Sequence, residues 1–128
     1  MTFLDTNFLI QFLAGDLLAV TRMKRAEEEG EARQITPVVL YEFLIGAHIA
    51  GGKYLHQALE FAATLDLVPL DLESCDEAGK LGAALRRKGS PIGDMDTINA
   101  GAALRHRGRM VTRDSDYARV AGLVVESF

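Results

Sequence analysis

Short apolar runs alternate along the chain with longer segments in which apolar residues recur every three or four positions. The short runs have polar or turn-forming flanks and predict five strands, at residues 2–5, 33–37, 65–70, 108–113 and 122–127. The longer segments predict helices at residues 16–29, 38–50, 54–64, 74–88 and 95–107. Strands that alternate with helices are typical of a parallel sheet covered on both faces, so the pattern predicts an α/β fold.

The size of the chain suits one domain covering residues 1–128. A chain of this length buries roughly two-thirds of the surface that its unfolded form exposes. Its 48% apolar and 25% charged residues match ordinary globular proteins rather than disordered ones. No internal repeat and no Pro/Gly/Ser-rich linker interrupts the pattern. We therefore expect a single α/β domain.

Cysteine usage and hydropathy favour a cytoplasmic protein. Cys75 is the only cysteine, so no intramolecular disulfide is expected. We find no secretory signal pattern. Polar residues interrupt every apolar run well before the roughly 20 residues that cross a bilayer, and we expect no membrane span.

Acidic residues occupy the positions that follow predicted strands or open the neighbouring helices. They are Asp5, Glu42, Asp94, Asp96, Asp114 and Asp116. Ligands of open parallel sheets bind beyond the carboxyl ends of the strands, so these side chains are expected to share one crevice. Taken singly, an aspartate at a helix start is explained as an N-cap. Several carboxylates at one edge repel one another, however, and capping gives no reason for them to be neighbours.

Glu42 is the only charged residue in the helical segment VVLYEFLIGA. Apolar neighbours on nearly every side predict that its carboxylate is largely desolvated, which is costly without a cationic partner. Two partners fit this prediction: an arginine of a neighbouring element, or a bound cation shared with the other acids.

A cluster of carboxylate oxygens suits a hard divalent cation, Mg²⁺ or Mn²⁺, with water in the remaining positions. His48, His56 and His106 show no paired spacing, and one cysteine does not make a zinc site. A divalent cation among the acids is expected to activate a water for attack on a phosphodiester. It also bridges the acids to an anionic substrate, which the net charge of −4 otherwise disfavours.

Three polar residues and one arginine beside these acids are expected to support the site. Thr6, Asn7 and Thr112 stand where their side chains can hydrogen-bond a carboxylate or a bound water, although such residues also serve as caps. Arg113, between the fourth strand and Asp114, is expected to contact substrate or to form an ion pair within the acidic cluster.

Four segments resemble, in order and spacing, the acidic motifs of the PIN domain family: FLDTN, VVLYEFLIGA, PIGDMDTINAGAAL and MVTRDSDY. The resemblance runs from Thr2 to about Val125 and is nearest to the small VapC-type toxins of toxin–antitoxin pairs. It implies a three-layer α/β/α fold with a doubly wound parallel sheet. It also implies a single-strand-type endoribonuclease that depends on Mg²⁺ or Mn²⁺, forms a homodimer and is covered by a VapB-type antitoxin.

The resemblance also assigns roles to individual residues. The catalytic, metal-binding acids are expected to be Asp5, Glu42, Asp96 and Asp114, with Asp116 as a further metal ligand. Asp94 matches a polar position beside the third acid, and Thr6 and Asn7 match a pair that supports the first. Asn99 departs from the family pattern D-x-x-I-A-A, which has an apolar residue there. This departure changes the packing or the hydrogen bonding near Asp96.

Two other functions fit parts of the pattern. A receiver-like signalling domain shares the doubly wound fold and an acidic Mg²⁺ pocket. It needs a paired acid after the first strand and a lysine after the last, whereas this chain has Thr6 there and no lysine beyond Lys88. A non-catalytic PIN-fold interaction module is disfavoured by the intact set of acids, and metal-dependent RNA cleavage separates it from an enzyme.

Overall fold

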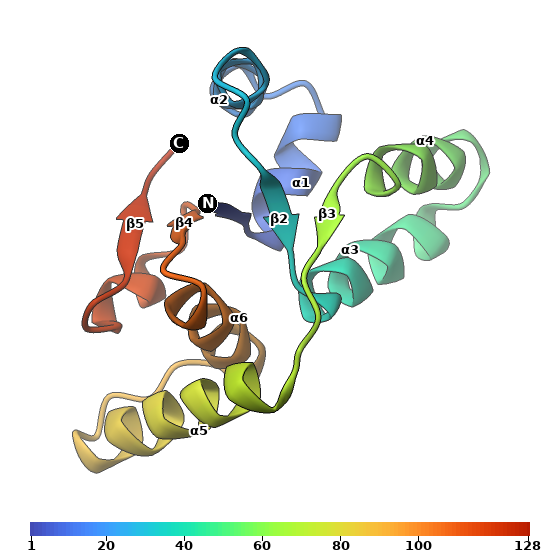
Figure 1. Ribbon diagram of the computed structural model, residues 1–128. Coiled ribbons are helices and arrows are strands. Elements are labelled where there is room, and N and C mark those ends of the chain that lie inside the picture. Colours follow the sequence, from blue (N-terminus) through green and yellow to red (C-terminus); the bar gives the residue numbers. More distant parts are fainter.

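Strand β1 (Thr2–Leu4) lies at the centre of a five-stranded sheet in a computed structural model that describes residues 1–128 (Figure 1). The other strands are β2 (Arg33–Ile35), β3 (Asp66–Leu67), β4 (Arg109–Val111) and β5 (Val124–Glu126). The strand order is β3-β2-β1-β4-β5, and every neighbouring pair is parallel. All three residues of β1 are buried, as expected for a central strand.

Six α-helices and one 3₁₀ helix connect these strands. They are α1 (Thr6–Leu13), α2 (Leu17–Glu28), α3 (Pro37–Ala50), α4 (Gly52–Ala62), α5 (Leu72–Arg87), α6 (Asp94–Arg105) and the 3₁₀ helix η1 (Ser115–Arg119). Capping fixes where several of them begin. Thr36, for example, follows β2 and accepts a hydrogen bond from the backbone N–H of Val39 (3.2 Å), with Pro37 at the first helical position.

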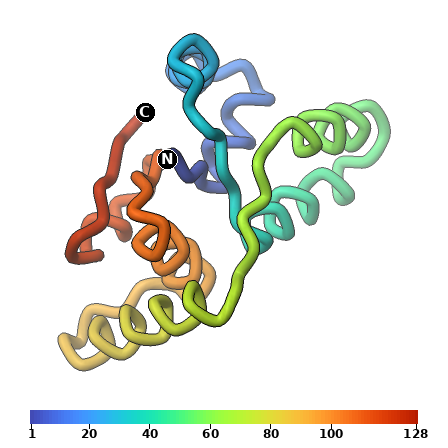
Figure 2. The backbone as a smooth tube through the Cα atoms, in the orientation of Figure 1, coloured from blue at the N-terminus to red at the C-terminus, as the bar shows by residue number.

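The helices form one layer on each face of the sheet. Strand side chains alternate between faces, so Leu4 of β1 and Val111 of β4 pack with α1, α2, α3 and α4. Phe3 and Met110 pack on the opposite face with α6 and η1, and α5 lies against α6. Figure 2 shows the chain changing face in the passage from β3 to α5. The predicted three-layer α/β/α fold is confirmed.

One α-helix, α1, is missing from the sequence prediction, and so is the 3₁₀ helix η1. The α1 sequence, TNFLIQFL, is apolar at most positions and follows β1 with no turn between them. The predicted strand at residues 2–5 in fact ends at Leu4, and Asp5 becomes the N-cap of α1 by accepting a hydrogen bond from the backbone N–H of Thr6. The acid after the strand therefore has a structural role as well as a candidate chemical one.

The carboxyl ends of β1 and β4 lie side by side at the point where the strand order reverses direction. Leu4 pairs with Val111, and the backbone N–H of Asp5 donates to the carbonyl of Val111 at 3.3 Å. Crevices at such reversal points are where open α/β sheets bind ligands. We therefore expect a ligand site among the residues that follow β1 and β4. No helix combines the length and apolarity that crossing a bilayer requires.

Candidate functional site

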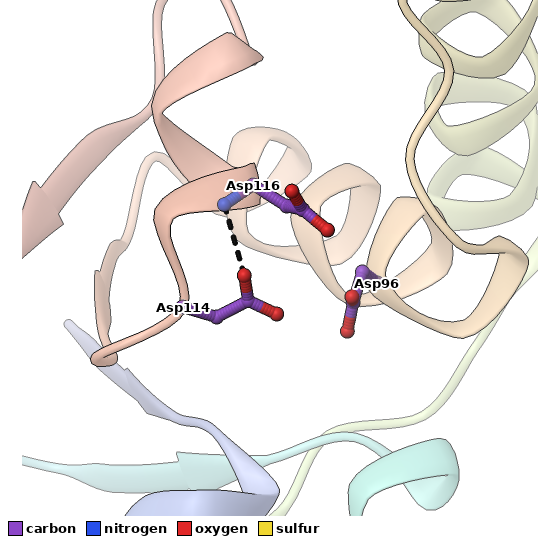
Figure 3. Close-up of side chains that lie close together, drawn as sticks. All are labelled: Asp96, Asp114 and Asp116. Atoms are coloured by element: carbon purple, nitrogen blue, oxygen red, sulfur yellow. Dashed lines mark hydrogen bonds between the residues drawn. The ribbon is translucent and has the colours of Figure 1, made fainter.

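Three carboxylates from two helix starts meet beyond the carboxyl end of β4. Asp96 lies in the first turn of α6, Asp114 is the N-cap of η1, and Asp116 lies in the first turn of η1. One oxygen of each lies within 4.8 Å of the other two. Figure 3 shows the side chains around a common space, with Asp114 accepting a hydrogen bond from the backbone N–H of Asp116 (2.9 Å). We call these three residues the acidic cluster.

Asp5 adjoins this cluster and is held firmly at the end of β1. It is buried, and its two carboxylate oxygens accept hydrogen bonds from the backbone N–H of Thr6 and the hydroxyl of Thr112, each at 2.7 Å. The Thr112 oxygen in turn accepts a hydrogen bond from the backbone N–H of Asp114 at 2.9 Å. Thr112 therefore connects the acids that follow two neighbouring strands.

Glu42 reaches the site from α3 through Thr6, whose hydroxyl donates to Oε1 of Glu42 at 3.1 Å. The prediction that this carboxylate is largely desolvated overestimates its burial. Glu42 is only half-buried, because α3 lies at the surface here and its neighbours Tyr41 and Ile45 are exposed. No arginine or lysine forms a salt bridge with Glu42, so the arginine alternative is not realised.

Burial and neighbouring charge together shift the pKa of Asp5. Burial raises its pKa, hydrogen bonds from Thr112 and Thr6 oppose that rise, and the charges of Asp114 and Glu42 raise the pKa further. Glu42 therefore lies close enough to act electrostatically on Asp5, although it comes from a different helix.

The pKa of Asp96 is also raised, first by burial, and the hydrogen bond from Tyr117 opposes that rise. The charges of three other acids raise the pKa further, namely Asp5, Asp114 and Asp116. The ionised form of Asp96 is thus disfavoured by the carboxylates around it.

The donor set fits a hard divalent cation. All the candidate ligands are carboxylate oxygens, and no histidine or cysteine belongs to the cluster. Asp5, Asp96 and Asp114 form no salt bridge, and Arg119 approaches Asp116 only at 3.6 Å. A divalent cation would relieve the mutual repulsion that the protein's own cations leave uncompensated.

Two predicted supporting residues, Asp94 and Asn7, lie apart from the acidic cluster. Asp94 is exposed at the start of α6 and pairs with Arg86 at 3.2 Å. Asn7 is exposed on α1 and makes no hydrogen bond with the acids. Neither side chain contacts the cluster.

Arg113 is also placed differently from the prediction of an ion pair within the acidic cluster. Its side chain leaves the strand end on the other side, pairs with Asp16 (2.8 Å) and lies over the ring of Phe128, 4.2 Å from the ring centroid. Successive residues at a strand end point in opposite directions, so Arg113 turns away while Thr112 faces Asp5.

Tyr117 is a residue of the site that sequence reasoning missed. It is completely buried, and its hydroxyl donates to Oδ1 of Asp96 at 3.1 Å. Burial, followed by the charges of Asp5 and Asp96, raises the pKa of this hydroxyl, which therefore remains a hydrogen-bond donor. The only signal in the sequence is the position of Tyr117 directly after Asp116.

Removing one charge from the cluster should stabilise the metal-free protein. A carboxyl group with a raised pKa in the folded state contributes stability that is full below its unfolded pKa and is lost as pH rises through its folded pKa. At neutral pH with EDTA, Asp96→Asn should therefore melt at a higher temperature than the wild type, and the difference should shrink toward acid pH. Differential scanning calorimetry measures both. An Asp96→Asn protein less stable than the wild type in EDTA would contradict the account.

The chain is similar to proteins of one family along almost its whole length. A family model described as "PIN domain" matches residues 2–123. A protein of Shigella flexneri named "tRNA(fMet)-specific endonuclease VapC" is 30% identical, and the match covers 98% of this chain and 96% of that protein.

Solved structures show the same architecture. A structure of DNA-bound VapBC from Salmonella typhimurium superposes with a TM-score of 0.87 at 25% identity, covering 98% of this chain and 96% of that one. A structure of VapBC2 from Rickettsia felis bound to a promoter DNA fragment gives a TM-score of 0.87 at 20% identity, over 99% of this chain and 98% of that one. The second likeness supports the fold alone.

Proposed function

The chain belongs to the PIN domain family, and from this premise we propose that it is the toxin ribonuclease of a VapBC-type toxin–antitoxin pair. Residues 1–128 act as one PIN domain that hydrolyses RNA with a divalent cation, Mg²⁺ or Mn²⁺. The family match excludes the receiver-like alternative. The observation that carries the proposal is the convergence of the acidic cluster beside Asp5 at the strand-order reversal.

In this proposal the acids hold the cation, and the polar residues orient the acids. The proposed ligands are Asp5, Glu42, Asp96, Asp114 and Asp116. Thr6 holds Glu42 by a direct hydrogen bond, and Thr112 holds Asp5 in the same way. The carboxylates of these two acids therefore do not need to reorganise when the cation binds. Bound there, a divalent cation lowers the pKa of water toward neutrality and stabilises charge that develops on a phosphodiester.

Arg119 is the proposed contact for the RNA backbone. It lies at the rim of the acidic cluster, half-exposed, and donates to the carbonyl of Pro91 while approaching Asp116 at 3.6 Å. A guanidinium in this position can bind a phosphate oxygen next to the cation, which offsets the net negative charge of the protein.

Transfer RNA is the first substrate class to test, because the relative from Shigella flexneri is named for cleavage of tRNA(fMet). The purified chain is incubated with tRNA(fMet) and with total RNA, in Mg²⁺, in Mn²⁺ and in EDTA. Cleavage in either metal and none in EDTA is expected. No cleavage of any RNA in either metal would refute the ribonuclease proposal and favour the interaction module, and equal cleavage in EDTA would refute its dependence on a divalent cation.

The proposed inhibitor is a VapB-type antitoxin. The VapBC structure from Salmonella typhimurium, whose matched chain is 25% identical to this one, supports this kind of partner. Co-expression with the product of a neighbouring small gene, followed by purification, tests whether a stable complex forms and whether RNA cleavage is suppressed.

A second copy of the chain is the proposed occupant of the exposed face of α3. Helix α3 is apolar on more than one side, and Tyr41, Ile45 and Ile49 are exposed at 57%, 42% and 82%. A patch of this kind on a surface helix favours association. Light scattering should give a dimer mass for the wild type and a monomer mass for Ile49→Glu. A monomeric wild type at every concentration would contradict the dimer.

A further inference from the structure

A cavity of about 440 Å³ lies between α5 and α6, which pack side by side (Figure 1). Gly79 and Gly82 form part of its α5 wall, and nothing lies within 4 Å of a Cβ placed on Gly79, so this part of the space is open. On α6 the cavity is lined by Asp94 and Ile98, four residues apart on one face of the helix. Asp96, two residues after Asp94, points to the opposite face, where the acidic cluster lies. The cavity is therefore separate from the proposed metal site.

The walls of the cavity are apolar, and its charged groups stand at the opening. The larger apolar side chains of the walls are those of Leu70, Leu85, Pro91, Ile92 and Ile98. Arg86 and Asp94 also line the cavity, with 70% and 84% of their side chains exposed, and they pair with each other at 3.2 Å. An exposed pair of this kind contributes little stability, so both groups are free to exchange it for a ligand. Apolar walls with one donor and one acceptor at the opening suit a flat ring whose edge carries both kinds of polar atom, as a nucleobase does.

The surface around the opening is basic. Arg86, Arg87 and Lys88 stand together at the end of α5, and all three are exposed. Arg87 and Lys88 form no salt bridge, so their charges are not neutralised by the protein. Basic residues at a helix C-terminus complement the helix dipole, but they also attract a phosphate backbone. In a protein with a net charge of −4, a basic rim beside an apolar cavity favours a nucleic-acid ligand over an apolar segment of another protein.

One side chain connects the cavity to the acidic cluster. Arg119 of η1 donates to the carbonyl of Pro91, which lines the cavity, at 3.1 Å, and it approaches Asp116 of the acidic cluster at 3.6 Å. The cavity and the cluster thus lie on either side of the arginine that is the proposed contact for the RNA backbone. An RNA strand with one phosphate at the cluster can pass Arg119 and bring a nearby nucleotide to the cavity.

We propose that the cavity between α5 and α6 receives one unstacked base of the RNA substrate, with Arg86 and Asp94 binding the edge of that base at the opening. This proposal rests on the proposed function, because it assumes that the acidic cluster cuts RNA. Sequence-specific binding of RNA commonly uses single-stranded bases that are splayed out of the stack and held by apolar and polar groups together. A base held in the cavity fixes which phosphate reaches the cluster, so the cavity selects the cleavage site.

The test is cleavage in Mg²⁺ of a short oligoribonucleotide that spans the cleavage site mapped in the RNA that the wild type cuts. In a matched series, one base at a time is removed near that site while its sugar and phosphate are kept. Removal of the base that enters the cavity should lower kcat/KM of the wild type about 10-fold, as the loss of one base contact does. Gly79→Leu, which fills the cavity, should lower kcat/KM for the intact oligonucleotide about as much. It should lose nothing further when that base is removed, because both changes abolish one contact.

Ala84→Leu is the matched control. Ala84 is an exposed residue of the same helix and does not line the cavity, so this variant adds the same side chain outside the proposed pocket. It should behave as the wild type does on every oligonucleotide of the series. If Gly79→Leu does not fold, the series on the wild type decides the question, since a wild type that tolerates the removal of every single base has no base pocket.

The outcomes separate this inference from the proposed function. Wild-type rates for Gly79→Leu on the intact oligonucleotide would overturn the base pocket and leave the ribonuclease intact. A further 10-fold loss in Gly79→Leu on removal of the same base would do so as well. Gly79→Leu that cuts RNA normally but no longer binds the antitoxin or forms a dimer would show that the cavity holds a protein segment instead. A wild type that cuts no RNA would overturn the proposed function, and this inference with it.

Discussion

RNA cleavage should fall by about 10²- to 10³-fold or more when Asp96 is replaced by asparagine, a change that removes one charge and almost no volume. Asparagine keeps an oxygen that can accept the hydrogen bond from Tyr117, so the fold around the site should persist. The loss should therefore come from weaker binding of the cation and from weaker stabilisation of the charge that develops during phosphodiester hydrolysis. Initial rates on tRNA in saturating Mg²⁺ measure the effect.

The matched control for this substitution is Asp76→Asn. Asp76 is an exposed aspartate on α5 that pairs only with Lys80, four residues along the same helix, and surface pairs of this kind contribute little stability. The Asp76→Asn substitution removes the same charge from the protein without changing the crevice, so this variant should keep wild-type activity. Full activity in Asp96→Asn, or an equal loss in Asp76→Asn, would show that the acidic cluster is not the catalytic centre.

Gly101→Ala should be among the most destabilising single substitutions in the protein. A Cβ atom at this position would lie 2.5 Å from the Cα of Ala78 and 2.7 Å from its backbone nitrogen, where α6 packs directly against α5. Backbone atoms of a packed helix cannot swing aside as a flexible side chain can. We expect a loss of about 3 kcal/mol in the free energy of unfolding, at or above the upper end for overpacked cores. Urea denaturation followed by circular dichroism measures it.

Gly79→Ala provides the comparison on the neighbouring helix. Nothing lies within 4 Å of a Cβ placed on Gly79, so the substitution should be neutral or stabilising by up to about 1 kcal/mol through helix propensity. A Gly101→Ala variant as stable as Gly79→Ala would mean that α5 and α6 are not packed as closely as described. Because α6 carries Asp96, partial loss of this packing should also reduce RNA cleavage.

The layout of the site could be predicted where it follows from strand topology. Asp5 and Asp114 each follow a strand, and parallel strands bring their carboxyl ends to one edge of the sheet, so the short runs before these acids are enough to bring them together. The short apolar runs with turn-forming flanks likewise predict β1 and β4 as strands. Glu42 stands out in the sequence as the only charged residue of an apolar helical segment, but its exposure depends on which parts of α3 other elements cover.

Contacts between side chains far apart in sequence could not be predicted in this way. Arg113 stands next to Asp114 in sequence, yet it pairs with Asp16, 97 positions away, because its side chain leaves the strand end on the opposite side. The hydrogen bond between Thr36 and Asn99 depends on how α3 and α6 meet, and no local pattern contains that information. In α1, apolar residues at most positions hide the helical period, and tertiary packing on the sheet decides the structure.

Anomalous scattering from crystals soaked in MnCl₂ tests whether these acids gather around a divalent cation. We expect an anomalous peak between the carboxylates of Asp96, Asp114 and Asp116, on the side that faces Asp5, and no peak there in Asp96→Asn crystals. Ordered wild-type crystals with an empty cluster at millimolar Mn²⁺, or with manganese bound only elsewhere on the protein, would contradict it.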